Sequence, residues 1–102
     1  MIFQRFSKEM LRRAKNNKEP IPSSEDIEYM YKRYLAAKRQ FNNSEDKYLT
    51  AQKFKSFYKL GNKERLKYRE KCANEGIEFT PYQVNLYINL LAIIGEDYLG
   101  EL

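Results

Sequence analysis

Basic side chains crowd one stretch of this chain, from Lys47 to Lys71. The stretch holds nine basic residues against Glu64 and Glu70, and aromatic residues are interleaved with them. Lysine and arginine make salt-dependent contacts with phosphate groups, and tyrosine stacks on unpaired bases. This pattern predicts a nucleic-acid-binding surface, and it leaves open a solvated helix face whose aromatic residues belong to the core. The residues expected to contact phosphate are Lys53, Lys55, Lys59, Lys63, Arg65, Lys67 and Arg69.

A second basic stripe lies near the N-terminus. Between residues 2 and 15, apolar residues occupy one side of a predicted helix and basic residues occupy the opposite side. Such a stripe suits a phosphate backbone or an anionic membrane surface. So small a core needs the apolar side, so we expect no membrane binding and assign the stripe to the cationic surface. Its residues are Arg5, Lys8, Arg12 and Lys15.

Charge is distributed unevenly over the whole chain. All nineteen basic residues lie between Arg5 and Lys71, together with nine of the fourteen acidic residues. The remaining C-terminal part holds five acidic residues and no basic one. Such segregation fits a protein that offers a cationic surface to a polyanion or to an acidic partner. It favours binding over chemistry.

Residues suited to catalysis or metal binding are scarce. The chain has no histidine, the commonest general base and transition-metal ligand, and its single Cys72 excludes an internal disulfide and a cysteine-based zinc site. The carboxylate pairs at 25–26 and 45–46 fall in predicted first turns of helices, where capping accounts for them. We therefore expect no enzyme activity, no metal and no cofactor. One unpaired thiol favours a cytoplasmic, intracellular setting.

The elements that must position these residues are all helical. Apolar residues recur at helical spacing and no segment alternates at period two, so we predict an all-α fold, a compact bundle of about five short helices. The predicted helices cover residues 2–15, 24–40, 45–60, 63–74 and 81–94. We expect one domain over residues 1–102, with a basic helix and proline linker in 1–22, basic helices in 23–75 and an acidic, apolar segment in 76–102.

Several helix boundaries can be predicted from local sequence signals. Thr80 with Gln83 predicts a capping box, with Pro81 at the first helical position. Ser23 with Asp26 closely resembles a second capping box. Further boundaries are predicted at Ser44, which would cap the third helix, at Gly61 and Asn62, at Gly76, which would close the fourth helix, and at Gly95, which would end the last one.

The last predicted helix is apolar nearly all round, apart from a narrow strip that includes Asn85 and Asn89. Such a helix must be buried, so we place it at the centre of the bundle. Because a single layer of neighbours would not easily cover every side, we expect a homodimer. The alternative is the buried centre of a self-sufficient bundle. The residues predicted to form the dimer interface are Leu86, Leu90 and Ile93.

One short motif resembles a known family. From Leu49 onward, the spacing of aromatic, leucine, acidic and tyrosine positions is similar to that in the second and third helices of HMG boxes. The resemblance implies minor-groove binding and DNA bending. HMG boxes carry tryptophan where Phe57 stands and continue into a long basic helix, whereas this chain turns acidic and breaks at Gly76, so the similarity does not assign the family. The matching residues are Phe57, Leu60, Glu64, Arg65, Tyr68 and Cys72.

These observations favour a small non-enzymatic protein that binds nucleic acid, with DNA preferred, through a basic helical face. The alternative is a protein-binding inhibitor or regulator, of the host-takeover or anti-defence type, that docks this face on an acidic partner. The chain is rich in lysine, asparagine and tyrosine and has no tryptophan, as AT-rich codons would encode. This composition favours a phage or mobile-element origin.

Overall fold

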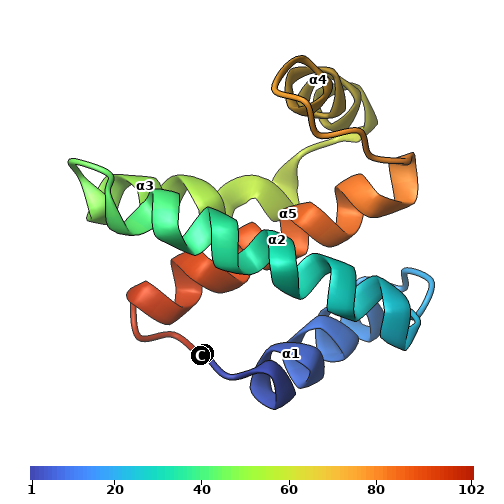
Figure 1. Ribbon diagram of the computed structural model, residues 1–102, viewed down its shortest axis with the longest axis horizontal. Helices are drawn as coiled ribbons and strands as arrows, with labels where there is room; N and C mark the ends of the chain where they lie inside the picture. The colour runs from blue at the N-terminus through green and yellow to red at the C-terminus, as the bar shows by residue number, and fades with distance from the viewer.

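The computed structural model describes residues 1–102, and Figure 1 shows an all-α bundle, which confirms the predicted fold class. No residue lies in a β-strand. No helix has the combined length and hydropathy needed to cross a membrane. The elements are α1 (Phe3–Asn16), α2 (Ser24–Asn42), α3 (Lys47–Ser56), the 3-10 helix η1 (Phe57–Lys59), α4 (Asn62–Asn74) and α5 (Pro81–Tyr98).

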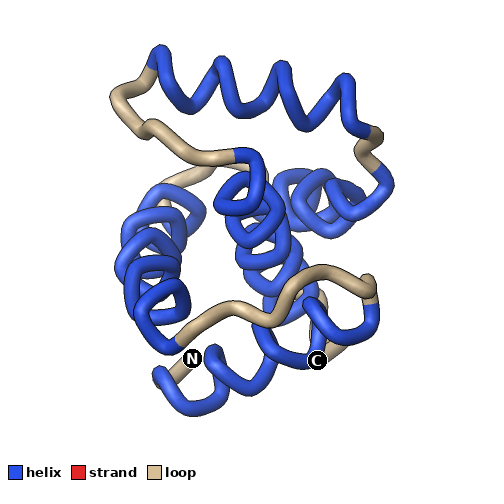
Figure 2. The backbone as a smooth tube through the Cα atoms, turned by 90° about the vertical axis from the view of Figure 1, so that its right-hand side faces the viewer, coloured by secondary structure: helices blue, strands red, loops and turns tan.

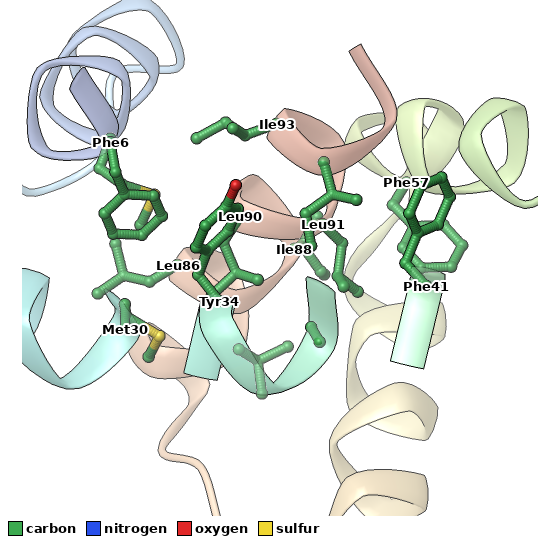
Figure 3. Close-up of a cluster of buried hydrophobic side chains, with 14 of the residues drawn as sticks. Phe6, Met30, Tyr34, Phe41, Phe57, Leu86, Ile88, Leu90, Leu91 and Ile93 are labelled. Carbon is green, nitrogen blue, oxygen red and sulfur yellow. The ribbon is translucent and has the colours of Figure 1, made fainter. Parts of the chain in front are cut away.

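Helix α5 organises the packing of the bundle. It contacts α1, α2, α3, η1 and α4, and it is the one element that touches all the others. Every residue from Ile88 to Gly95 is buried. Figure 3 shows apolar side chains of α5 lying among Phe6, Tyr34 and Phe41, which come from α1 and α2. Full burial of one large apolar side chain contributes about 1.5–3 kcal/mol, so α5 supplies much of the core.

The predicted dimer interface lies inside the monomer. Leu86, Leu90 and Ile93 have no exposed surface, and Figure 3 shows Leu86 between Phe6 and Met30. The prediction that these three residues contact a second chain is therefore wrong. The physical reason is that α1 and α2 cover this side of α5, so a single chain supplies the neighbours that the apolar helix needs.

Gly95 does not end the last helix, which continues to Tyr98. A Cβ atom at position 95 would clash with the carbonyl oxygen of Ala51 and lie 3.1 Å from the amide nitrogen of Lys55. Gly95 therefore lets the backbones of α5 and α3 approach closely. The helix ends before Gly100, whose φ of 73° lies in the left-handed region that favours glycine.

The two predicted capping boxes are both present. The Ser23 hydroxyl accepts from the Asp26 amide at 3.1 Å, and the Asp26 carboxylate accepts from the Ser23 amide at 3.2 Å. The Thr80 hydroxyl accepts from the Gln83 amide at 3.1 Å, and the Gln83 side-chain oxygen accepts from the Thr80 amide at 3.0 Å. These bonds satisfy amides that would otherwise lack partners, so α2 and α5 begin where the sequence predicts.

One other boundary differs in detail from the prediction, and another agrees with it. Asp46 caps α3 by accepting from the Leu49 amide at 3.0 Å, whereas the Ser44 hydroxyl donates to the Phe41 carbonyl at 2.6 Å. Ser44 therefore closes α2 rather than opening α3, and a carboxylate is the stronger acceptor for an amide. Gly76, with φ 85°, ends α4 as predicted.

Helix α4 is joined to the bundle less extensively than the others. Its backbone packs against that of α5 alone, and Cys72 is its one buried residue. Figures 1 and 2 both show α4 at one end of the molecule, with α1 at the opposite end. The basic helices are thus spread around the fold.

Candidate nucleic-acid interface

The structure does not bring all the predicted basic residues together. The α1 stripe lies at the end of the molecule opposite α4, and α1 contacts only α2 and α5 (Figures 1 and 2). One continuous surface made from α1, α3 and α4 is therefore absent. The basic residues of α3, η1 and α4 form a separate region.

The α1 stripe is the solvent-facing side of a docked helix. Arg5, Lys8 and Lys15 are exposed, while the opposite side of the helix buries Phe6 and Met10. Arg12 donates from Nη2 to the Glu9 carboxylate at 2.6 Å, and this hydrogen bond raises the pKa of Arg12 above its ordinary value. Part of the charge of the stripe is thereby neutralised within α1.

The structure adds an ion pair that sequence reasoning missed. Arg13 pairs with Glu96, which joins α1 to α5, and burial lowers the pKa of Arg13. Ala14 and Met10 beside it are buried, so Arg13 sits at the edge of the docked face. The position of Arg13 next to the apolar side of the helix is the sequence signal that could have indicated its partial burial.

Two of the predicted phosphate ligands attach α4 to the rest of the protein. Arg65 Nε donates to the Leu60 carbonyl at 2.9 Å, and its Nη1 donates to Asn85 Oδ1 at 2.7 Å. Arg69 Nε donates to the carbonyl of Phe79, in the connection that leads to α5. Both guanidinium groups are partly buried. Their first role is therefore structural.

Three of the five interleaved aromatic residues belong to the core. Phe54 and Phe57 lie with ring centroids 5.8 Å apart, and Phe57 meets Tyr68 edge-on at 5.5 Å. Burial raises the pKa of Tyr68 far above its usual value. These contacts also account for the spacing that resembles HMG boxes, because they join η1 to α4 within this fold.

The remaining two aromatic residues are exposed beside lysines. A groove of about 350 Å³, which we call the α3 groove, runs along the outer side of α3 and η1. Tyr48 is 56% exposed and Tyr58 is 54% exposed. The ammonium of Lys59 lies 5.7 Å from the centre of the Tyr58 ring. The groove is lined by Tyr48, Gln52, Lys55, Ser56, Tyr58 and Lys59, together with Leu99 and Glu101 of the C-terminal segment.

Glu101 partly neutralises the α3 groove. Its carboxylate pairs with the Lys55 ammonium, and both side chains remain about two-fifths exposed, at 40% and 41%. An exposed pair of this kind is worth at most about 1 kcal/mol. The pair therefore opens readily when a stronger anion approaches Lys55.

A second basic groove lies on the other side of α3. It measures about 330 Å³, and its floor includes Phe54, Phe57 and Tyr68. We call it the α3–α4 groove. Three lysines and one acid surround this floor, namely Lys53, Lys67, Lys71 and Glu64. Lys63 is exposed near the start of α4.

Lysines thus lie on two sides of α3, and on one of these sides exposed tyrosines lie beside them. Helical spacing could have separated the two sets of aromatic residues. Ala51 and Phe54 share the core-facing side of α3, whereas Tyr48 and Gln52 share an adjacent, exposed side, where the Gln52 amide donates to the Tyr48 hydroxyl at 3.1 Å. The arrangement can hold phosphate groups and unpaired bases side by side.

Comparison of the chain with models of known families, with curated proteins and with solved structures finds no match.

Proposed function

We propose that this protein binds single-stranded nucleic acid, with DNA as the expected ligand, through the α3 groove. The observation that carries the proposal is the exposure of Tyr48 and Tyr58 next to Lys55 and Lys59. Stacking of one base on an aromatic side chain is worth about 1–3 kcal/mol and tolerates any base. The lysines supply the salt-dependent contacts with phosphate.

The lysines of the α3–α4 groove extend the positive surface. Lys53, Lys67 and Lys71 face this second groove with Glu64 as the one acid among them. They add long-range attraction for a polyanion without base recognition. Binding of low sequence specificity follows from this composition of ammonium and phenol groups.

We propose binding without catalysis. The polar groups of the α3 groove are ammonium, phenol, amide, hydroxyl and carboxylate groups, and its hydroxyl at Ser56 donates to the Lys53 carbonyl at 2.7 Å. A serine used in this way has no adjacent base to activate it. A cytoplasmic location and a phage or mobile-element origin remain predictions from the sequence.

The binding unit in this proposal is the monomer. The sequence predicts a homodimer through the last helix, but Leu86, Leu90 and Ile93 are buried within the monomer and are not available for that contact. Light scattering at high protein concentration tests the monomer, for which a mass near 12.3 kDa is expected. A dimer mass would require another contact surface.

Fluorescence anisotropy with labelled oligonucleotides tests the proposed function. We expect a single strand of about 12 nucleotides to bind more tightly than the matching duplex. The logarithm of the affinity should fall linearly with the logarithm of salt concentration. Tyr58→Ala should weaken single-strand binding at least about fivefold without changing the salt slope.

Two results would contradict the proposal. Absence of oligonucleotide binding at low salt would move the assignment to the alternative predicted from the sequence, an inhibitor or regulator that docks on an acidic protein. A duplex bound as tightly as the single strand, with Tyr58→Ala neutral, would leave the lysines as phosphate contacts and remove the stacking role.

A further inference from the structure

A different groove lies between α4 and the first turns of α5. It has a volume of about 240 Å³ and is distinct from both basic grooves along α3. We call it the α4–α5 groove. It is lined mainly by Asn62, Arg65, Leu66, Arg69, Val84 and Asn85.

The two arginines of this groove are held in place from behind. Arg65 and Arg69 are one helical turn apart, and each donates from Nε to a backbone carbonyl, that of Leu60 and that of Phe79 respectively. Arg65 also donates from Nη1 to Asn85 Oδ1 and from Nη2 to the Tyr58 carbonyl, whereas the Nη atoms of Arg69 have no acceptor in the protein. A guanidinium fixed in this way loses little freedom when it binds an anion, so the donors are preorganised.

No ion pair neutralises the positive charge of the groove. No carboxylate lines it, and neither arginine takes part in an ion pair. Glu70 and Glu78 line an adjacent depression that shares Leu66 and Arg69, and they too form no ion pair. The groove therefore favours an oxyanion, while the side chains of Leu66 and Val84 offer an apolar wall.

We propose that the α4–α5 groove binds a phosphate monoester carried on an aromatic body, such as the terminal phosphate of a nucleotide. A phosphate monoester carries nearly two negative charges at neutral pH and three acceptor oxygens, which match the paired N–H groups of guanidinium. The Asn62 amide adds a donor, and the apolar wall accommodates the ring. The groove is small, which suits a single nucleotide and not a run of polymer.

This inference does not rest on the α3 groove. The same phosphate chemistry is offered by a free mononucleotide and by the phosphorylated end of a strand. Binding at the α4–α5 groove would hold even if no polymer bound along α3.

Calorimetric titration at constant ionic strength tests the site. Deoxyadenosine 5′-monophosphate should bind, inorganic phosphate should bind more weakly, and deoxyadenosine should not bind. Leu66→Glu places a carboxylate at the groove from a side chain that is already 54% exposed, so the fold should persist. We expect it to weaken monophosphate binding at least about tenfold.

A matched control is available on the next residue of α4. Lys67→Gln lowers the net charge by the same amount and faces the α3–α4 groove. We expect it to change monophosphate affinity less than about twofold, because only the remote field changes. Circular dichroism melts of both variants show whether the fold is retained.

A pair of oligonucleotides distinguishes the two sources of phosphate. A 5′-phosphorylated strand that binds more tightly than its 5′-hydroxyl counterpart, with the difference lost in Leu66→Glu, identifies the strand end. Equal binding of the two strands, with monophosphate still bound, identifies the free nucleotide.

Two outcomes would overturn the inference. One is monophosphate binding no tighter than that of the nucleoside. The other is equal weakening by Leu66→Glu and Lys67→Gln. Either result would leave Arg65 and Arg69 as attachments of α4 alone. Neither result would contradict binding at the α3 groove, because that binding is tested separately with Tyr58→Ala and strands that carry a 5′-hydroxyl end.

Discussion

Helices α5 and α4 are held in the bundle by different interactions. α5 buries apolar side chains against every other element, whereas the backbone of α4 packs against that of α5 alone and α4 buries only Cys72. Two arginine side chains, Arg65 and Arg69, supply the polar attachments of α4. The comparison shows that the basic residues of one charged segment are of two kinds. Some donate hydrogen bonds within the protein, and others are exposed to solvent. Side-chain type alone does not reveal that division.

The largest expected effect comes from adding a side chain where the backbones of α5 and α3 approach closely. Gly95→Ala should lower the free energy of unfolding by about 3 kcal/mol, because the added Cβ meets the Ala51 backbone, which cannot move aside as a flexible side chain can. Denaturant unfolding measures the loss. The control, Gly76→Ala, adds a methyl group into open space at φ 85° and should cost about 1 kcal/mol of backbone strain. Equal losses at the two positions would mean that α3 and α5 are not in close contact.

The attachment of α4 should be the next most sensitive point. Arg65→Met removes a charged donor from Asn85 and from the Leu60 carbonyl, and we expect a loss of about 2 kcal/mol in unfolding free energy. Hydrogen exchange should show α4 opening before α5. Lys67→Met, on an exposed side chain of the same helix, should stay within about 0.5 kcal/mol. A Lys67 effect as large as that of Arg65 would contradict the structural role.

The start of α5 offers a smaller effect. Thr80→Ala removes the acceptor for the Gln83 amide and should cost about 1 kcal/mol. Ser23→Ala removes the equivalent acceptor at the start of α2 and should cost a similar amount. Thermal melts measure both, and an unchanged melting temperature for Thr80→Ala would show that the cap contributes nothing.

The phenol of Tyr68, a half-buried residue of α4, should have almost no effect on stability at neutral pH. Burial raises the pKa of Tyr68 above its ordinary value of 10.0, and the pKa of Tyr87 moves the same way. Because the folded state favours the neutral phenol, the stabilisation is complete below about pH 10 and declines as the pH rises further. Tyr68→Phe should be neutral at pH 7 and should flatten the alkaline loss of stability. An unchanged alkaline profile would contradict the burial.

The sequence predicts most of the helix boundaries, but it does not predict which basic residues bind within the protein and which stay exposed. Capping boxes at Ser23 and Thr80 act locally, so the sequence contains the whole interaction. The close approach at Gly95 depends on Ala51, which is remote in sequence, so the sequence alone does not distinguish Gly95 from a glycine that ends a helix.

The same limit applies to the candidate site. Arg65 and Arg69 resemble their basic neighbours in type, and only the fold brings Asn85 and the Phe79 carbonyl to them. The exposure of Tyr48 follows from helical spacing, which the interleaved pattern of aromatic residues obscured.

The salt dependence of single-strand binding tests the central claim most directly, with matched lysine variants on the two basic regions. Lys59 borders the α3 groove, and Lys8 is exposed on α1, which lies at the end of the molecule opposite α4. Lys59→Gln should weaken binding and reduce the slope of log affinity against log salt by about 0.7, the loss of one phosphate contact. Lys8→Gln should leave both the affinity and the slope unchanged. A slope that falls with Lys8→Gln and not with Lys59→Gln would place the interface on α1 and contradict the account.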